Sequence, residues 1–130
     1  MMYEYAAEIT RVIDGDTFDA RIDLGFRCHT EQRFRLLGYD APEMRGETAR
    51  MGRLAKDAMA AAIFSGTVTL RTQKGDSFGR WLASVLVQPS NPDHMSFDLV
   101  DRLVRDGWGQ RWDGRGARPQ WNPRLPYPNP

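Results

Sequence analysis

The chain has few of the residues that form disulfides or bind metal through cysteine and histidine. Cys28 is the single cysteine among 130 residues, so no disulfide can form within the chain. His29 and His94 are the two histidines, and neither has a partner at metal-ligand spacing. These absences exclude a disulfide-stapled scaffold and a zinc site of the common spacings.

The chain also lacks long apolar segments. No stretch approaches the ~20 residues needed to span a bilayer. The N-terminus is acidic and aromatic, without the basic start and apolar run of a signal peptide. We therefore expect a cytoplasmic location and no membrane contact, with secretion of a processed form left open.

Lysine is scarce, and the positive charge is carried almost wholly by arginine. The net charge is +1, with 18 basic and 17 acidic side chains. Residues 101–130 hold six arginines against three aspartates, whereas the preceding part of the chain is slightly acidic. Arginine suits bidentate phosphate contacts, but a codon bias produces the same excess, so composition alone does not indicate nucleic acid.

The apolar pattern predicts β-β-β-α-β-β-α, an α+β chain built on a five-stranded OB-fold barrel with two flanking helices. Asp14-Gly15 is a hairpin signal between the first two strands, and Ser96 is a plausible cap for the second helix. The predicted strands are 5–12, 17–22, 33–39, 67–72 and 81–87, and the predicted helices are 48–64 and 96–107.

The composition changes near residue 110, which predicts a folded domain over 1–110 and an extended tail over 111–130. Five prolines among residues 119–130 exclude a continuous helix or strand there. Interleaved arginines and aromatics suit an arm for single-stranded nucleic acid. A strap that packs Trp121 and Tyr127 against the barrel is the alternative that we favour. We expect a monomer.

Three polar clusters supply, in one order along the chain, the carboxylates of Asp16, Asp40 and Glu43 and the guanidiniums of Arg35 and Arg80. Two carboxylates can hold a divalent cation, one can take a proton from water, and two guanidiniums can clamp a phosphate. Each cluster alone is also typical of a turn or a half-buried strand. The clusters are Asp14–Thr17, Arg35–Glu43 and Asp76–Arg80.

Taken together, these clusters resemble the staphylococcal nuclease family over roughly residues 5–110. The resemblance rests on 12–17, 34–43 and 76–80, and on Leu103-Val104-Arg105-Asp106-Gly107. It implies an OB barrel and a Ca²⁺-dependent nuclease acting on DNA or RNA, in which the 5′-oxygen leaves and 3′-phosphate ends remain.

The resemblance also implies a role for each site residue. Asp16 and Asp40 would ligate Ca²⁺ with their carboxylates, and Ala41 would add its carbonyl oxygen. Glu43 would be the general base. Arg35 and Arg80 would bind the scissile phosphate, with Asp76 in a supporting position.

The chain departs from the family pattern at several places. Ala41 stands where threonine is common, and Phe78 replaces an aromatic with a hydroxyl. The tyrosines after the second helix are missing, and Trp108 and Trp112 are candidate stacking surfaces in their place. The long C-terminal helix has no counterpart. The alternatives are a non-catalytic OB module that binds nucleic acid, or a docking protein whose proline tail is the ligand.

Overall fold

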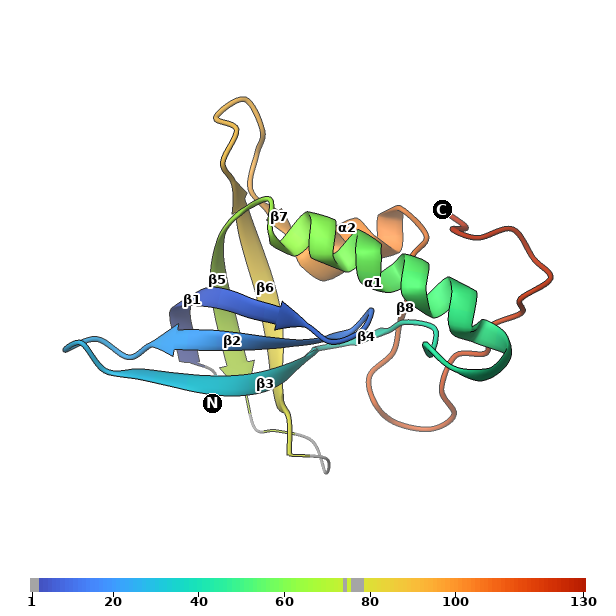
Figure 1. Cartoon of the computed structure of the whole chain (residues 1–130), viewed down its shortest axis with the longest axis horizontal. Coiled ribbons are helices and arrows are strands. Elements are labelled where there is room, and N and C mark those ends of the chain that lie inside the picture. Colours follow the sequence, from blue (N-terminus) through green and yellow to red (C-terminus); the bar gives the residue numbers. More distant parts are fainter. Residues whose placement is uncertain (1–2, 74, 76–78) are drawn as a thin grey trace.

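The computed structural model describes residues 3–73, 75 and 79–130. Figure 1 shows its central element, a closed barrel of five strands in the order β3-β2-β1-β5-β6, with β3 also paired to β6. The closing β3–β6 pair is parallel, and the other pairs in the barrel are antiparallel. The predicted OB-type barrel is confirmed. Its strands are β1 (Tyr3–Val12), β2 (Thr17–Asp23), β3 (His29–Leu36), β5 (Gly66–Gln73) and β6 (Trp81–Pro89).

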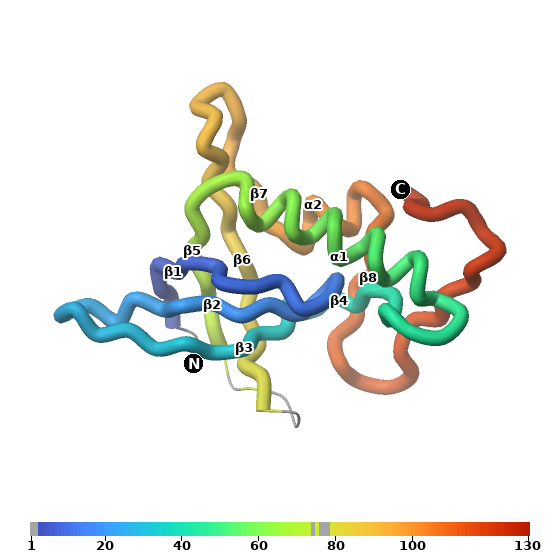
Figure 2. Tube along the Cα trace, in the orientation of Figure 1, coloured from blue at the N-terminus to red at the C-terminus, as the bar shows by residue number. Residues whose placement is uncertain are grey.

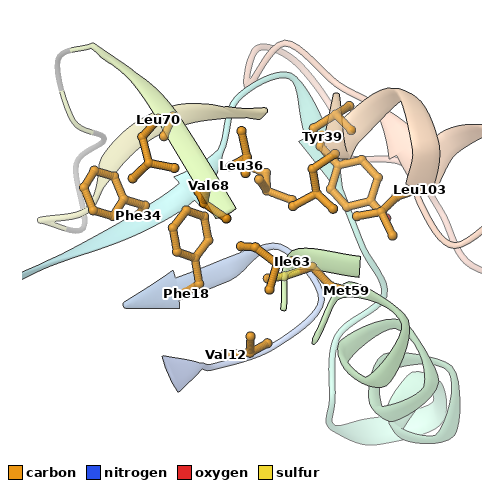
Figure 3. Packing of buried hydrophobic residues seen from close by; sticks show 14 of the residues in the cluster. Val12, Phe18, Phe34, Leu36, Tyr39, Met59, Ile63, Val68, Leu70 and Leu103 are labelled. Carbon is orange, nitrogen blue, oxygen red and sulfur yellow. The ribbon is translucent and has the colours of Figure 1, made fainter. Parts of the chain in front are cut away.

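Alternating apolar residues direct one face of each strand into the barrel. On β6, Ala83, Val85 and Val87 are fully buried, while the residues between them are more exposed. The rings of Phe18 and Phe34 stack inside the barrel with centroids 5.5 Å apart. Figure 3 shows these rings among the aliphatic side chains of the core. Burial of this surface is the main favourable contribution to folding.

Helix α1 (Ala49–Ile63) confirms the helix predicted over 48–64 and follows a short 3₁₀ turn, η1 (Gly46–Thr48). It crosses the barrel near the β1–β2 turn (Figure 1). The residues that it buries recur every four positions, as the apolar stripe predicts. They include Met51, Ala55, Met59 and Ile63.

Helix α2 (Leu99–Arg105) begins later than the sequence predicts. Ser96 is not its cap, because β7 (Phe97–Asp98) first pairs with β6, placing Val87 opposite Phe97. The cap is Asp98, whose carboxylate accepts a hydrogen bond of 2.9 Å from the Asp101 backbone N–H. The sheet pairing therefore delays the helix by one short strand.

The predicted strand over 33–39 is divided in two. Strand β3 ends at Leu36, and the chain turns at Gly38, which has a φ of +73° that favours glycine. A short strand, β4 (Tyr39–Asp40), then pairs antiparallel with β8 (Gln110–Arg111) in a second sheet. This division matters for the site, because it places Asp40 beside the start of the C-terminal tail (residues 111–130).

Beyond β8, the described tail contains no helix or strand. Figure 2 traces it as an irregular loop that passes the start of α1 and returns to the turn after α2. Near its end, the Tyr127 hydroxyl donates to the Trp108 carbonyl at 2.7 Å, and the Asn129 N–H donates to the Gly107 carbonyl at 3.2 Å. The Trp121 and Tyr127 rings meet edge to face at 6.4 Å.

Within the described residues, every helix is too short or too polar to cross a membrane. Two positions singled out in the sequence, Asp76 and Phe78, lie outside the residues that the structure describes.

Candidate active site

Asp16 is held in the turn between β1 and β2. Its backbone N–H donates to Asp14 Oδ1 at 3.0 Å, and its own Oδ1 accepts from the Thr17 hydroxyl at 3.0 Å. A Cβ on Gly15 would lie 2.7 Å from Ala41 Cβ and 2.9 Å from Ala55 Cβ. Only glycine allows this close approach, which brings the turn against the segment that carries Asp40 and Ala41.

Arg35 joins the two aspartates that the sequence predicts as metal ligands. Its Nη2 lies 3.1 Å from Asp40 Oδ1 and 3.6 Å from Asp16 Oδ2. The same nitrogen donates to the Tyr39 carbonyl at 3.3 Å, and the Ala41 N–H donates to Asp16 Oδ2 at 3.3 Å. One carboxylate from the β1–β2 turn and one from β4 therefore converge on one guanidinium.

The electrostatic environment of Asp16 is unusual for a surface turn. Burial, followed by the nearby negative charge of Asp14, raises the pKa of Asp16 to about 7, while Arg35 acts in the opposite direction. Burial therefore makes the ionised form of Asp16 costly, and the charge of Asp14 adds to that cost. Such a group favours an additional cation.

Glu43 lies at the edge of this pair, at the loop before α1. The Thr48 hydroxyl donates to the Glu43 carbonyl at 2.8 Å. On α1, a Cβ at Gly52 would lie 2.4 Å from that same carbonyl oxygen. Gly52 thus lets the loop rest directly on the helix, and the helix fixes the backbone from which the half-exposed Glu43 carboxylate extends.

Two tail residues, which sequence reasoning did not assign to the site, contact its carboxylates. Arg118 Nη2 lies 2.6 Å from Asp40 Oδ1, and Arg118 Nη1 lies 2.7 Å from Glu43 Oε1. Trp121 Nε1 donates to Asp40 Oδ2 at 3.2 Å. Burial lowers the pKa of Arg118, but hydrogen bonds to Glu43 and Asp40 outweigh it and raise that pKa above its ordinary value.

Trp112 lies between the barrel and tail arginines. Its ring centroid is 5.3 Å from the Arg35 guanidinium carbon and 5.9 Å from that of Arg118. Its backbone N–H donates to the Gly38 carbonyl at 3.0 Å. Both cations are within the range of a cation–π interaction. The Arg-Trp pattern of the tail was the sequence signal for these contacts, but it did not say where they would be made.

One cavity of about 470 Å³ gathers the predicted residues. Asp16, Ala41, Glu43, Arg35 and Arg80 all line it, together with Trp112 and Arg118. Asp40 is fully buried and reaches the cavity through its ion pairs with Arg35 and Arg118. The structure therefore brings all six predicted site residues to one place.

A second cavity, about 270 Å³, lies elsewhere on the barrel and is lined by apolar and uncharged polar side chains, among them Tyr3, Tyr5 and Trp81. The larger cavity, in contrast, is lined by both carboxylates and guanidiniums. Within the described ranges, three or more acidic, histidine or cysteine side chains are not arranged as a metal cage.

The site thus combines carboxylates and guanidiniums in one cavity beside a barrel. A family model described as staphylococcal nuclease homologue matches residues 33–118, which is more than half of the chain. The chain belongs to the family of staphylococcal nuclease homologues. Membership indicates a nuclease or a nucleic-acid-binding protein.

The chain is also similar to the protein named Protein ParB from Escherichia coli. The two are 32% identical over 123 residues, which cover 90% of this chain and 64% of that relative. The chain thus spans less than two thirds of the relative's length.

Proposed function

We propose that this protein is a Ca²⁺-dependent nuclease that hydrolyses phosphodiester bonds in DNA or RNA. The observation that carries the proposal is the convergence of Asp16, Asp40, Glu43, Arg35 and Arg80 on one cavity. A structural ion pair needs two of these groups, whereas phosphodiester hydrolysis uses all five. Family membership supports the same substrate class.

The donor set fits calcium by its chemistry. Ca²⁺ takes hard oxygen ligands in a flexible shell that also admits water. Asp16 and Asp40 would hold the ion with their carboxylates, and Ala41 would add its carbonyl oxygen. The raised pKa of Asp16 is compatible with this assignment, because burial makes its charged form costly and a bound cation would offset that cost. When bound, the ion would neutralise negative charge on the phosphate and promote ionisation of water.

The remaining residues have separate tasks. Arg35 and Arg80 would donate to the phosphate oxygens and stabilise charge that grows in the transition state. Glu43, on the cavity edge and half exposed, would accept a proton from the attacking water. Trp112, also in the cavity wall, offers a flat surface to a base beside the phosphate.

A second function, binding without catalysis, has one observation in its favour. In this structure Arg118 contacts both Asp40 and Glu43, so the proposed ligand and the proposed base are already paired. An OB-fold module that only binds nucleic acid would keep such a pairing permanently. The nuclease must be able to release it.

The test is hydrolysis of single-stranded DNA, duplex plasmid and RNA in Ca²⁺ and in excess EDTA. We expect cleavage with Ca²⁺, loss of cleavage in EDTA, and 3′-phosphate ends on the products. Glu43→Gln should keep Ca²⁺ binding and lose most of kcat, and Asp57→Asn, on the exposed side of α1, is the matched control. Full activity in EDTA would reject the metal. Binding without any turnover would favour the module.

A further inference from the structure

The tail supplies donors to both oxygens of the buried Asp40 carboxylate. Arg118 Nη2 and Nε lie 2.6 and 3.2 Å from Oδ1, and Trp121 Nε1 lies 3.2 Å from Oδ2. Arg118 Nη1 also lies 2.7 Å from Glu43 Oε1. The Arg118 guanidinium therefore contacts Asp40, a proposed metal ligand, and Glu43, the proposed base. The Trp121 indole contacts Asp40.

Two arginines place positive charge beside the Asp40 carboxylate. Arg35, from β3, already lies 3.1 Å from Asp40 Oδ1, and the Arg118 guanidinium shares that oxygen. A divalent cation on Asp40 would stand beside both guanidiniums in a poorly solvated site, where like charges repel strongly. Arg35 is mostly buried, with 14% of its side chain exposed, whereas 44% of the Arg118 side chain is exposed. Arg118 is the cation that can leave.

The attachment of the tail allows such a departure. Outside the site, its hydrogen bonds to the rest of the chain are at its ends. They involve Arg111 and the Trp112 N–H at one end, and Tyr127 and Asn129 at the other, where the Trp121 ring also meets Tyr127. The intervening segment, residues 113–126, is irregular chain. Arg118 can therefore withdraw while the tail stays tethered, and the tether keeps its effective concentration at the site high.

We propose that the tail is an intramolecular competitor of the metal, in which Arg118 is a resident cation on Asp40 and Glu43 that divalent metal must displace. This inference rests on the proposed function, because it takes Asp40 as a metal ligand. The tail then holds the metal-free protein in an inactive arrangement. Metal binding and release of residues 113–126 from the site are coupled, and the coupling is reciprocal.

The primary experiment measures binding of Ca²⁺ alone, by titration calorimetry without nucleic acid, to the full-length protein and its variants. Arg118→Ala should bind Ca²⁺ about tenfold more tightly than wild type, within the usual range of coupling between two sites. Arg124→Ala is the matched control, since Arg124 is an exposed tail arginine away from the cavity, and it should bind as wild type does. Trp121→Phe should tighten binding by a smaller factor.

A second measurement follows the tail itself. Trypsin cleavage after Arg115, followed by mass spectrometry, should quicken when Ca²⁺ is added to wild type, and it should be fast in Arg118→Ala with or without Ca²⁺. Circular dichroism checks that each variant is folded, and Arg118→Gln replaces Arg118→Ala if the latter is not. This readout does not depend on activity.

The outcomes separate the two proposals. If wild type and Arg118→Ala bind Ca²⁺ equally, or the variant binds more weakly, the competition is rejected while the calcium site stands. If neither protein binds Ca²⁺, both the competition and the calcium-dependent function are rejected. Tighter binding by Arg118→Ala, with an unchanged Arg124→Ala control, supports the competition.

Discussion

The site has two halves that differ in how they are held. The barrel half, made of Asp16, Arg35 and Asp40, comes from the ends of β-strands, and its side chains are 10%, 14% and 0% exposed. The tail half, Arg118 with Trp121, comes from irregular chain, and Arg118 is 44% exposed. Strands, or the turn beside one, thus carry the groups to which we assign the metal and the phosphate, whereas irregular chain carries the groups that we propose the metal displaces.

The largest expected effect breaks the barrel half. Arg35→Lys keeps a positive charge beside the two aspartates but loses the planar fork that can donate to a phosphate. We expect kcat to fall about 100-fold, or ~3 kcal/mol at the transition state, as for one lost electrostatic donor. Steady-state kinetics on a fixed oligonucleotide measure it, with Arg21→Lys, exposed on β2, as the control.

A near wild-type kcat in Arg35→Lys would show that Arg35 is a counter-charge for Asp40 and not a phosphate ligand. Lysine is preferred to alanine in this test. Alanine would remove the guanidinium beside Asp16 and one of the two guanidiniums beside the buried Asp40, and would thereby destabilise the fold itself.

The second prediction concerns pH and metal-free stability. Burial raises the pKa of Asp16 to about 7 from 3.8. At a pH between these two values, Asp16 is therefore protonated in the folded protein and ionised in the unfolded chain. The contribution of Asp16 to the free energy of unfolding should therefore be complete below about pH 4 and should decline as pH rises to about 7. From pH 5 to pH 7 we expect a loss of about 2 kcal/mol.

Urea denaturation in EDTA at several pH values measures this slope, and Asp16→Asn should flatten it. Asp19 is the comparator, because its hydrogen bond from Arg33 lowers its pKa. Its contribution is present above its ordinary pKa and lost as pH falls, so Asp19→Asn should alter only the acidic side. An equal pH slope in wild type and Asp16→Asn would contradict the burial argument.

Sequence reasoning reached the barrel half because its signals are local. Hairpin chemistry at Asp14-Gly15 and apolar alternation each depend on a few neighbouring residues. The roles of Asp16, Arg35 and Asp40 came from the family resemblance, which also rests on short local motifs. The barrel and both helices were predicted from such patterns, and the structure agrees within a few residues. The split of the third strand and the later start of α2 were missed, because both result from pairing with distant segments, β8 and β6.

The tail half could not be placed in this way. The contact between Arg118 and Asp40 joins residues 78 positions apart, and the tail between them has no periodicity to register it against the barrel. The sequence favoured packing of Trp121 and Tyr127 against the barrel but assigned no partner to Arg118. The β4–β8 pairing starts the tail beside Asp40, which the sequence did not predict.

A smaller effect tests how the tail is anchored. The Tyr127 hydroxyl donates to the Trp108 carbonyl at 2.7 Å, and the ring meets Trp108 edge to face at 5.6 Å. Tyr127→Phe keeps the ring contact and removes the hydrogen bond, so the free energy of unfolding should fall by about 1 kcal/mol. Urea denaturation measures it. A strap predicts this loss with unchanged kcat, whereas unchanged stability would mean that the anchor contributes nothing in solution.

The smallest effect is expected at Tyr39, the buried tyrosine that precedes Asp40 in β4. The Tyr39 hydroxyl is buried and has no hydrogen-bond partner within the described residues. A Cβ at Gly109 would lie 2.2 Å from this oxygen, so the backbone is packed directly against the ring. Burial also raises the pKa of Tyr39 well above its usual value, which keeps the hydroxyl neutral.

Removing an unpaired buried hydroxyl leaves no partner behind, so Tyr39→Phe should leave the free energy of unfolding unchanged or raise it by up to ~1 kcal/mol. The variant is measured beside Tyr127→Phe under identical urea conditions, because the same chemical change then reports two different environments. A loss of more than 1 kcal/mol in Tyr39→Phe would show that the hydroxyl is satisfied in solution. The two tyrosines would then no longer differ in whether their hydroxyl is hydrogen-bonded.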